Sequence, residues 1–124
     1  TAVLDREGLE PVPANRRDVS GKTVVIPDDM IASGSSVVQA AKALKERGAG
    51  DIYVCATHGV FSGPAKDRLA GSGIKEVIVT NTVPLNDQAR SIVDPPITVL
   101  SVANLFGEAI RRIHEEASIS ALFR

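Results

Sequence analysis

Several features that would point directly to a function are scarce in this 124-residue sequence. A single cysteine, Cys55, excludes a disulfide framework within the chain and fits a reducing compartment. Aromatic residues form only 3% of the chain and the net charge is -1, which argues against nucleic-acid binding by base stacking or bulk electrostatics. The apolar runs are too short to span a bilayer, and no signal peptide is evident. We therefore expect a cytoplasmic protein without a nucleic-acid or membrane partner.

The length fits a single domain, residues 1–124, that is large enough to bury a core. Residues 1–20 are polar, contain proline and show no sustained period, so we expect a loop or a fraying strand there. Because the sequence begins at Thr1 rather than Met, we expect it to be processed or cut from a longer protein.

Four apolar runs of strand length occupy the rest of the chain, at residues 23–26, 51–56, 76–80 and 97–100. They are continuously apolar rather than alternating, which is typical of parallel strands buried in a sheet. Strands that alternate with helices are the pattern of the α/β class. The sequence therefore predicts a three-layer α/β fold, with a central parallel sheet flanked by helices.

Three helical patterns accompany these runs. The first ends at Gly48, a shorter one covers residues 64–70, and the last begins at Ser101. The first helix carries its apolar face at Val37, Ala40, Ala41 and Leu44. We expect the last helix to bury the face formed by Val102, Phe106, Ala109 and Ile113.

Two neighbouring carboxylates, Asp28 and Asp29, follow the first apolar run, at a strand end where parallel sheets bind ligands. A loop of small residues then precedes the first helix: Ala32, Ser33, Gly34, Ser35 and Ser36. Unpaired N–H groups at such a helix start attract phosphate, whereas carboxylates accept hydrogen bonds from hydroxyl groups. The combination indicates a sugar phosphate as ligand. The alternative is that Ser35 or Ser36 only caps the helix while the aspartates solvate a turn.

The segment DDMIASGSS resembles the PRPP-binding loop of type I phosphoribosyltransferases. The segments AAKALKERGAGDIYVCATHGVFSGPAKDRL, EVIVTNTVPL and EAIRRIHEEASISALF resemble the C-terminal half of ribose-phosphate diphosphokinases, the PRPP synthetases. This resemblance covers residues 21–123, and its ATHGVFSG and SISALF segments are more specific than the loop. It implies a phosphoribosyltransferase-like fold and an enzyme that transfers the diphosphoryl group of ATP to ribose 5-phosphate, giving PRPP and AMP.

The resemblance also implies roles for the residues of the loop. Asp28 and Asp29 would bind the ribose hydroxyls, and residues 32–36 would bind the 5-phosphate of ribose 5-phosphate or PRPP. Most diphosphokinases have a third aspartate where this chain has Ala32. Because alanine also occurs there in phosphoribosyltransferase loops, we expect phosphate binding to be retained.

The resemblance implies further functional residues, some of which are expected outside this chain, while others match this sequence less closely than the loop does. The Mg²⁺ ligands and most of the ATP pocket belong to an N-terminal half that this sequence does not contain, so no metal ligand is assigned here. The catalytic cation would be Arg6, which stands where the family has a lysine, although a solvated surface charge is an equal reading. Ser118, Ser120 and Phe123 resemble a regulatory segment that binds phosphate or ADP at a subunit interface, which implies a homo-oligomer.

Two other functions remain open at this point. A stand-alone phosphoribosyltransferase would need a segment that recognises a base, and none is evident. A non-catalytic regulatory protein associated with diphosphokinases is favoured by the missing Lys-Arg motif and opposed by the complete loop. His58 is read either as a ligand contact or as a structural residue of the rim, and Cys55 as a small buried side chain.

Overall fold

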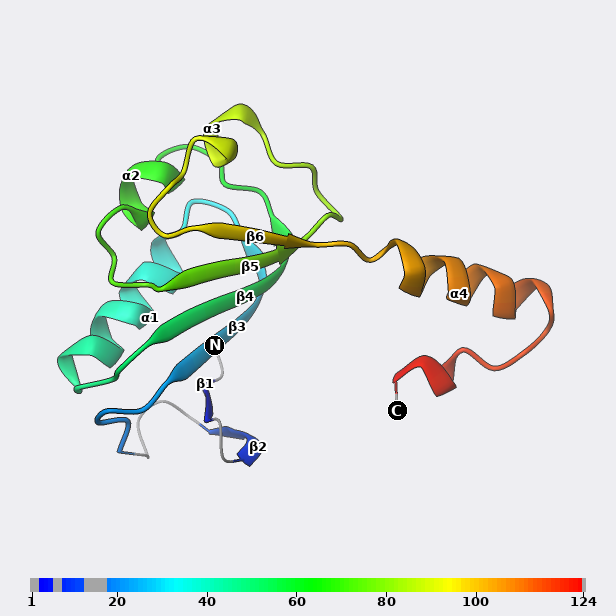
Figure 1. Ribbon diagram of the computed structural model, residues 1–124, viewed down its shortest axis with the longest axis horizontal. Helices are drawn as coiled ribbons and strands as arrows, with labels where there is room; N and C mark the ends of the chain where they lie inside the picture. The colour runs from blue at the N-terminus through cyan, green and yellow to red at the C-terminus, as the bar shows by residue number, and fades with distance from the viewer. Residues whose placement is uncertain (1–2, 6–7, 13–17, 124) are drawn as a thin grey trace.

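A six-stranded sheet forms the centre of the protein (Figure 1). The computed structural model describes residues 3–5, 8–12 and 18–123. The strand order is β2-β1-β3-β4-β5-β6, and β3 to β6 are parallel, whereas β1 and β2 add an antiparallel edge. The strands are β1 Val3–Asp5, β2 Gly8–Val12, β3 Val24–Ile31, β4 Ile52–Gly59, β5 Glu76–Thr80 and β6 Ile97–Leu100. The predicted α/β class with a central parallel sheet is confirmed.

Strand β3 is longer than its apolar run indicated. It continues through both aspartates to Ile31, because Asp28, Met30 and Ile31 pair with Ala56, His58 and Gly59 of β4. The carboxylates therefore lie within the paired, carboxyl-terminal part of β3, and the loop begins only after Ile31.

Four α-helices and one short 3-10 helix complete the described part of the chain: α1 Ser35–Glu46, α2 Ala65–Leu69, α3 Asp87–Arg90, α4 Ala103–His114 and η1 Ser120–Phe123. Helix α1 ends as predicted, since the Gly48 N–H donates to the Lys45 carbonyl at 2.9 Å. Helix α3 was not predicted. Its signal is Asn86, whose side chain caps the helix by accepting from the Ala89 N–H at 2.7 Å.

The core lies between one face of the sheet and helices α1 to α3 (Figure 1). Alternate strand residues such as Ile26, Val54 and Val77 are buried on that face, where they pack with apolar side chains of the three helices. The residues between them, including Tyr53 and Ile78, point to the opposite face and are only half-buried. No described helix covers this second face, which carries polar side chains such as Glu76 and Thr98 beside the apolar ones.

Helix α4 extends away from the sheet beyond the end of β6 (Figure 1). The helix was predicted, but the expected burial of its apolar face is not seen: none of its residues is buried, and Phe106 and Ile113 are 57% and 63% exposed. At the base of the helix, the Asn81 side chain accepts from the Val102 N–H at 3.0 Å. This contact holds the start of the helix at the sheet edge, and from there the helix runs away from the sheet.

Candidate functional site

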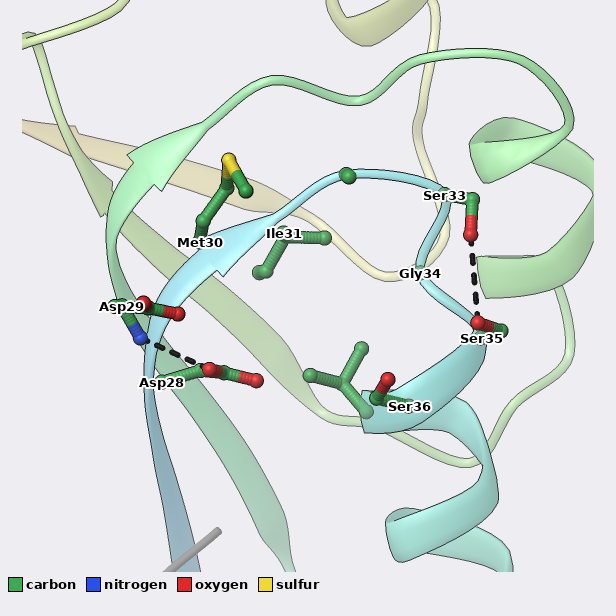
Figure 2. A pocket seen from close by; sticks show the side chains of 10 residues that line it. Asp28, Asp29, Met30, Ile31, Ser33, Gly34, Ser35 and Ser36 are labelled. Atoms are coloured by element: carbon green, nitrogen blue, oxygen red, sulfur yellow. Dashed lines mark hydrogen bonds between the residues drawn. The ribbon is translucent and has the colours of Figure 1, made fainter.

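A cavity of about 270 Å³ opens at the carboxyl end of β3, where the strand passes into α1 (Figure 2). Ten consecutive residues, 28–37, line it. All predicted binding residues of the carboxylate pair and the small-residue loop are therefore brought together around one hollow. None of the ten lining residues is basic, so the polar groups available there are carboxylates, hydroxyls and backbone amides.

The two carboxylates stand on the strand side of the cavity. Asp28 is half-buried and Asp29 is exposed, and the Asp29 N–H donates to Asp28 Oδ1 at 2.9 Å. Figure 2 shows the Asp28 side chain directed toward the first turn of α1, the turn that carries Ser36. Because an ionised carboxylate only accepts hydrogen bonds, this side of the cavity suits ligand hydroxyl groups.

The opposite side of the cavity is the start of α1. Gly34 is the N-cap, with φ at 75°, and no side chain among the described residues caps the helix. The reading of Ser35 or Ser36 as a simple cap is therefore wrong: Ser35 is the first helical residue, and its hydroxyl lies 3.3 Å from the Ser33 hydroxyl. The amides of the first turn thus face the cavity with the positive end of the helix dipole, which suits an anion.

A distant segment holds the loop in this shape. The N–H groups of Val60 and Phe61 donate to the Ile31 carbonyl, both at 3.0 Å, and that of Ser62 donates to the Ala32 carbonyl at 2.9 Å. From α2, Arg68 Nη1 donates to the Ser33 carbonyl at 3.4 Å. The loop after β4 and the helix that follows therefore set the backbone of the binding loop.

The support that residues 60–62 give to the binding loop was not predicted from the sequence, although the segment ATHGVFSG contains a pattern that indicates a tightly packed turn. Phe61 is fully buried and has a positive φ of 46°, which is uncommon for a residue other than glycine. A Cβ on Gly59 would lie 2.6 Å from the Phe61 ring, so only glycine fits there. A glycine two residues before a buried aromatic in a strand-end loop is the local pattern that marks such a tightly packed turn.

His58 and Cys55 are not among the residues that line the cavity. His58 is exposed, and its Nδ1 lies 2.7 Å from the Thr82 hydroxyl, while Thr82 also donates to the Thr57 carbonyl at 3.0 Å. Cys55 is half-buried on the second face of the sheet rather than fully buried. Burial, with a smaller contribution from Glu76, raises the pKa of the Cys55 thiol. It therefore stays protonated near neutral pH, which disfavours a nucleophilic role.

The remaining predicted site residues lie apart from the cavity or outside the described residues. Ser118 and Ser120 follow α4 with their hydroxyls 2.7 Å apart, and Phe123 is 77% exposed. Arg6 falls outside the described residues. Among the described residues, no group of three or more His, Cys, Asp or Glu could hold a metal ion, and no helix is long and apolar enough to cross a membrane.

Comparison with known proteins gives a consistent family. Residues 10–124 match the model of the phosphoribosyl synthetase-associated domain. A ribose-phosphate pyrophosphokinase of Synechococcus elongatus is 53% identical over 108 residues, which are 86% of this chain and 32% of the relative. Ribose-phosphate pyrophosphokinase 1, chloroplastic, of Arabidopsis thaliana is 47% identical over 106 residues, 86% of this chain and 26% of the relative.

The fold agrees with a solved structure as well. The crystal structure of phosphoribosylpyrophosphate synthetase from Mycobacterium smegmatis superposes with a TM-score of 0.74 at 46% identity. The match covers 82% of this chain and 33% of that protein. The chain thus spans between about a quarter and a third of the length of these relatives.

Proposed function

This chain belongs to the phosphoribosyl synthetase-associated domain family, and we propose that it is the ribose 5-phosphate-binding part, from the C-terminal half, of a ribose-phosphate diphosphokinase. The same site would bind the ribose 5-phosphate moiety of PRPP. The observation that carries the proposal is one cavity that is lined on one side by two carboxylates, of which Asp28 points toward α1, and on the other side by the start of α1. One ligand with hydroxyls at one end and a phosphate at the other matches both sides.

The two sides of the cavity would bind different parts of the ligand. Asp28 and Asp29 would accept hydrogen bonds from the ribose hydroxyls and so set the direction of the sugar. The backbone amides of residues 33–36 would donate to the 5-phosphate, and the hydroxyls of Ser33, Ser35 and Ser36 add further donors. A carboxylate that repels phosphate at one end also keeps the ligand from binding in reverse.

The whole enzyme would transfer the diphosphoryl group of ATP to the 1-hydroxyl of ribose 5-phosphate and release AMP. Such a reaction needs cations beside the transferred group. The lining residues of this cavity include no basic side chain, so we assign the cationic groups and the ATP pocket to parts of the enzyme outside this cavity. Arg6 remains a prediction for a catalytic cation.

Mg²⁺, which the family implies, does not fit the described residues as a complete site. The ion prefers near-octahedral oxygen ligands, and the described residues offer no cluster of three or more candidate ligands. We therefore derive no step through a metal at this cavity. Assembly into a homo-oligomer, with Ser118, Ser120 and Phe123 at a regulatory subunit interface, and a cytoplasmic location remain part of the proposal.

Titration calorimetry tests the binding role. We expect the 124-residue chain to bind ribose 5-phosphate weakly and to bind unphosphorylated ribose far more weakly. Asp28→Ala should reduce the binding free energy of ribose 5-phosphate by about 1.5–3 kcal/mol, because a charged hydrogen bond is lost. Asp67→Ala, which removes an exposed carboxylate from α2, is the matched control and should change nothing.

Two outcomes would contradict the proposal. If Asp28→Ala leaves the affinity unchanged while the melting temperature is also unchanged, the carboxylate does not touch the ligand. If the purified 124-residue chain forms AMP efficiently from ATP and ribose 5-phosphate, the chain itself carries a complete ATP site, contrary to its proposed role as only the ribose 5-phosphate-binding part of the enzyme.

A further inference from the structure

The loop at residues 60–63 connects the binding loop to an element that is far from both in the sequence. We call residues 60–63 the bridge loop. On its inner side, the N–H groups of Val60 and Phe61 donate to the carbonyl of Ile31, the last residue of β3, both at 3.0 Å. On its outer side, its carbonyls accept hydrogen bonds from α3 and the N-cap of that helix. The bridge loop therefore joins α3 to the sugar-phosphate cavity.

Two side-chain amides make the outer contacts. Asn86 Nδ2 donates to the Val60 carbonyl at 3.1 Å and to the Phe61 carbonyl at 3.4 Å. Gln88 Nε2 donates to the Gly63 carbonyl at 2.6 Å. We call the side chains of Asn86 and Gln88 the α3 amides. They act across 25 or 26 positions of the sequence, so these contacts are tertiary and not part of a local turn.

The backbone of the bridge loop needs such contacts. Phe61 has a φ of 46° and Gly63 a φ of 57°, and both values lie in the left-handed region. A residue other than glycine keeps such a conformation only where the surrounding structure holds it there. The carbonyls of both residues accept from an α3 amide. The α3 amides therefore hold the loop at the two points where its backbone conformation is least common.

Asn86 makes two kinds of contact, and only one of them serves the helix. Its Oδ1 accepts from the Ala89 N–H at 2.7 Å, which caps α3. A cap needs only this acceptor, and serine or aspartate would supply it as well. The donor end of the Asn86 amide is directed to the bridge loop instead. The stability of a four-residue helix therefore does not account for an amide at this position.

We propose that Asn86 and Gln88 are positioning residues for the sugar-phosphate cavity, which they shape through the bridge loop without touching the ligand. The inference rests on the binding role proposed above. Neither residue lines the cavity. By holding the bridge loop they fix the Ile31 carbonyl, and with it the direction in which the chain enters the first turn of α1. The amides of that turn would donate to the 5-phosphate, and their preorganisation increases affinity.

Helix α2 provides a second support, so loss of the α3 amides should weaken binding without abolishing it. Arg68 Nη1 donates to the Ser33 carbonyl at 3.4 Å, and Lys66 Nζ donates to the Ser91 hydroxyl, directly after α3, at 3.0 Å. Both side chains are long and exposed. They would keep the binding loop near its place while its backbone gains freedom.

Calorimetry with ribose 5-phosphate tests the proposal on the double variant Asn86→Ser/Gln88→Met. Serine retains a capping acceptor and methionine is close to glutamine in shape, so the variant loses the two amide donors without any added charge. We expect the dissociation constant to rise about 3–10-fold, because each lost hydrogen bond makes a modest net contribution. Gln39→Met, at an exposed position of α1, is the matched control and should leave the affinity unchanged.

Hydrogen exchange locates the change and separates positioning from stability. The amides of Val60, Phe61 and Ser62 should exchange at least about threefold faster in the double variant, while those of β4 and β5 report that the sheet is folded. Residues that only stabilised the fold would lower the melting temperature but leave the affinity of the folded protein unchanged. If the double variant does not fold, Asn86→Ser alone removes the donor to Val60 and Phe61 and should raise the dissociation constant about 2–4-fold.

Two results would overturn the proposal. One is a folded double variant that binds ribose 5-phosphate as tightly as the unsubstituted chain, and the other is unchanged exchange of the bridge-loop amides. Absence of binding by the unsubstituted chain would contradict the binding role itself. Binding by that chain together with equal binding by the variant would contradict only the positioning role, so the two failures are distinguishable.

Discussion

Helices α1 and α4 are both twelve residues long and both follow a parallel strand of the sheet, yet only α1 is packed against it. Helix α1 buries Val37, Ala41 and Leu44, whereas α4 buries none of its residues. The difference follows from the connections. Helix α1 must return the chain to the parallel strand β4, which forces it across the sheet, while no described strand follows α4.

This contrast shows that an apolar helix face predicts burial without identifying the surface that buries it. In α1 the covering surface is within the same chain, and the start of the helix becomes a rigid wall of the cavity. In α4 the covering surface is absent from the described residues. Four experiments can sharpen or contradict this distinction.

The largest expected effect comes from replacing a phenylalanine by alanine at two positions, one beneath the binding loop that precedes α1 and one on α4. Phe61→Ala should destabilise the chain by about 3–5 kcal/mol, because it empties a fully buried site beneath the binding loop. Phe106→Ala, at an exposed position of α4, should change the free energy of unfolding by no more than about 0.5 kcal/mol. Urea unfolding followed by circular dichroism measures both. Equal losses would show that α4 is already packed in this chain.

A pair of glycine replacements should have effects of opposite sign. Gly34→Ala should destabilise the chain by about 1–2 kcal/mol, since an alanine at φ 75° is strained even though its Cβ would meet Leu69 at an ordinary 3.5 Å. Gly107→Ala should favour helix formation in α4 by about 0.5–1 kcal/mol, because a Cβ there meets nothing within 4 Å. Thermal melting and the 222 nm signal report the two effects. A stabilising Gly34→Ala would mean that the loop is not held as described.

Two serine replacements test which helix end recognises the ligand. Ser36→Ala, in the first turn of α1, should weaken ribose 5-phosphate binding by about 0.5–1.5 kcal/mol through the loss of one hydrogen bond. Ser118→Ala, beyond the end of α4, should leave that affinity unchanged. Calorimetry with both variants is the measurement. Complete loss of binding in Ser36→Ala would indicate that the side chain and not the backbone holds the phosphate.

The smallest effect concerns pH and is confined to α4. The pKa of Glu108 is lowered from its ordinary 4.5 to about 2 by hydrogen bonds from Arg111 and Arg112. A lowered carboxyl pKa means that this contribution to helix stability is present above about pH 4.5 and is lost as the pH falls toward about 2. Circular dichroism should show a small loss of helix over this range that is reduced in Glu108→Gln. An identical acid titration of both proteins would assign the loss to other groups.

Much of the site could be predicted because its chemistry is local in the sequence. The carboxylates and the small-residue loop lie within nine consecutive positions, 28–36, so strand periodicity and the approach to a helix were sufficient to place them together. The exact end of β3 was not predictable in the same way. Pairing with β4 extends β3 as far as Ile31. Polar residues such as Asp28 have a low β-propensity and do not by themselves predict a strand.

The sequence by itself determined the parallel strands, the position of α1 and the type of chemistry at its start, because apolar runs, a glycine stop and a small-residue loop act over neighbouring residues. Only the tertiary structure decided how the loop is held and where α4 goes. The backbone N–H groups of Val60 to Ser62 that brace the loop come from about thirty residues away, and backbone groups leave no trace in side-chain patterns. The start of α4 likewise depends on Asn81, through a hydrogen bond across twenty-one positions, and no strand among the described residues follows α4 to return it to the sheet.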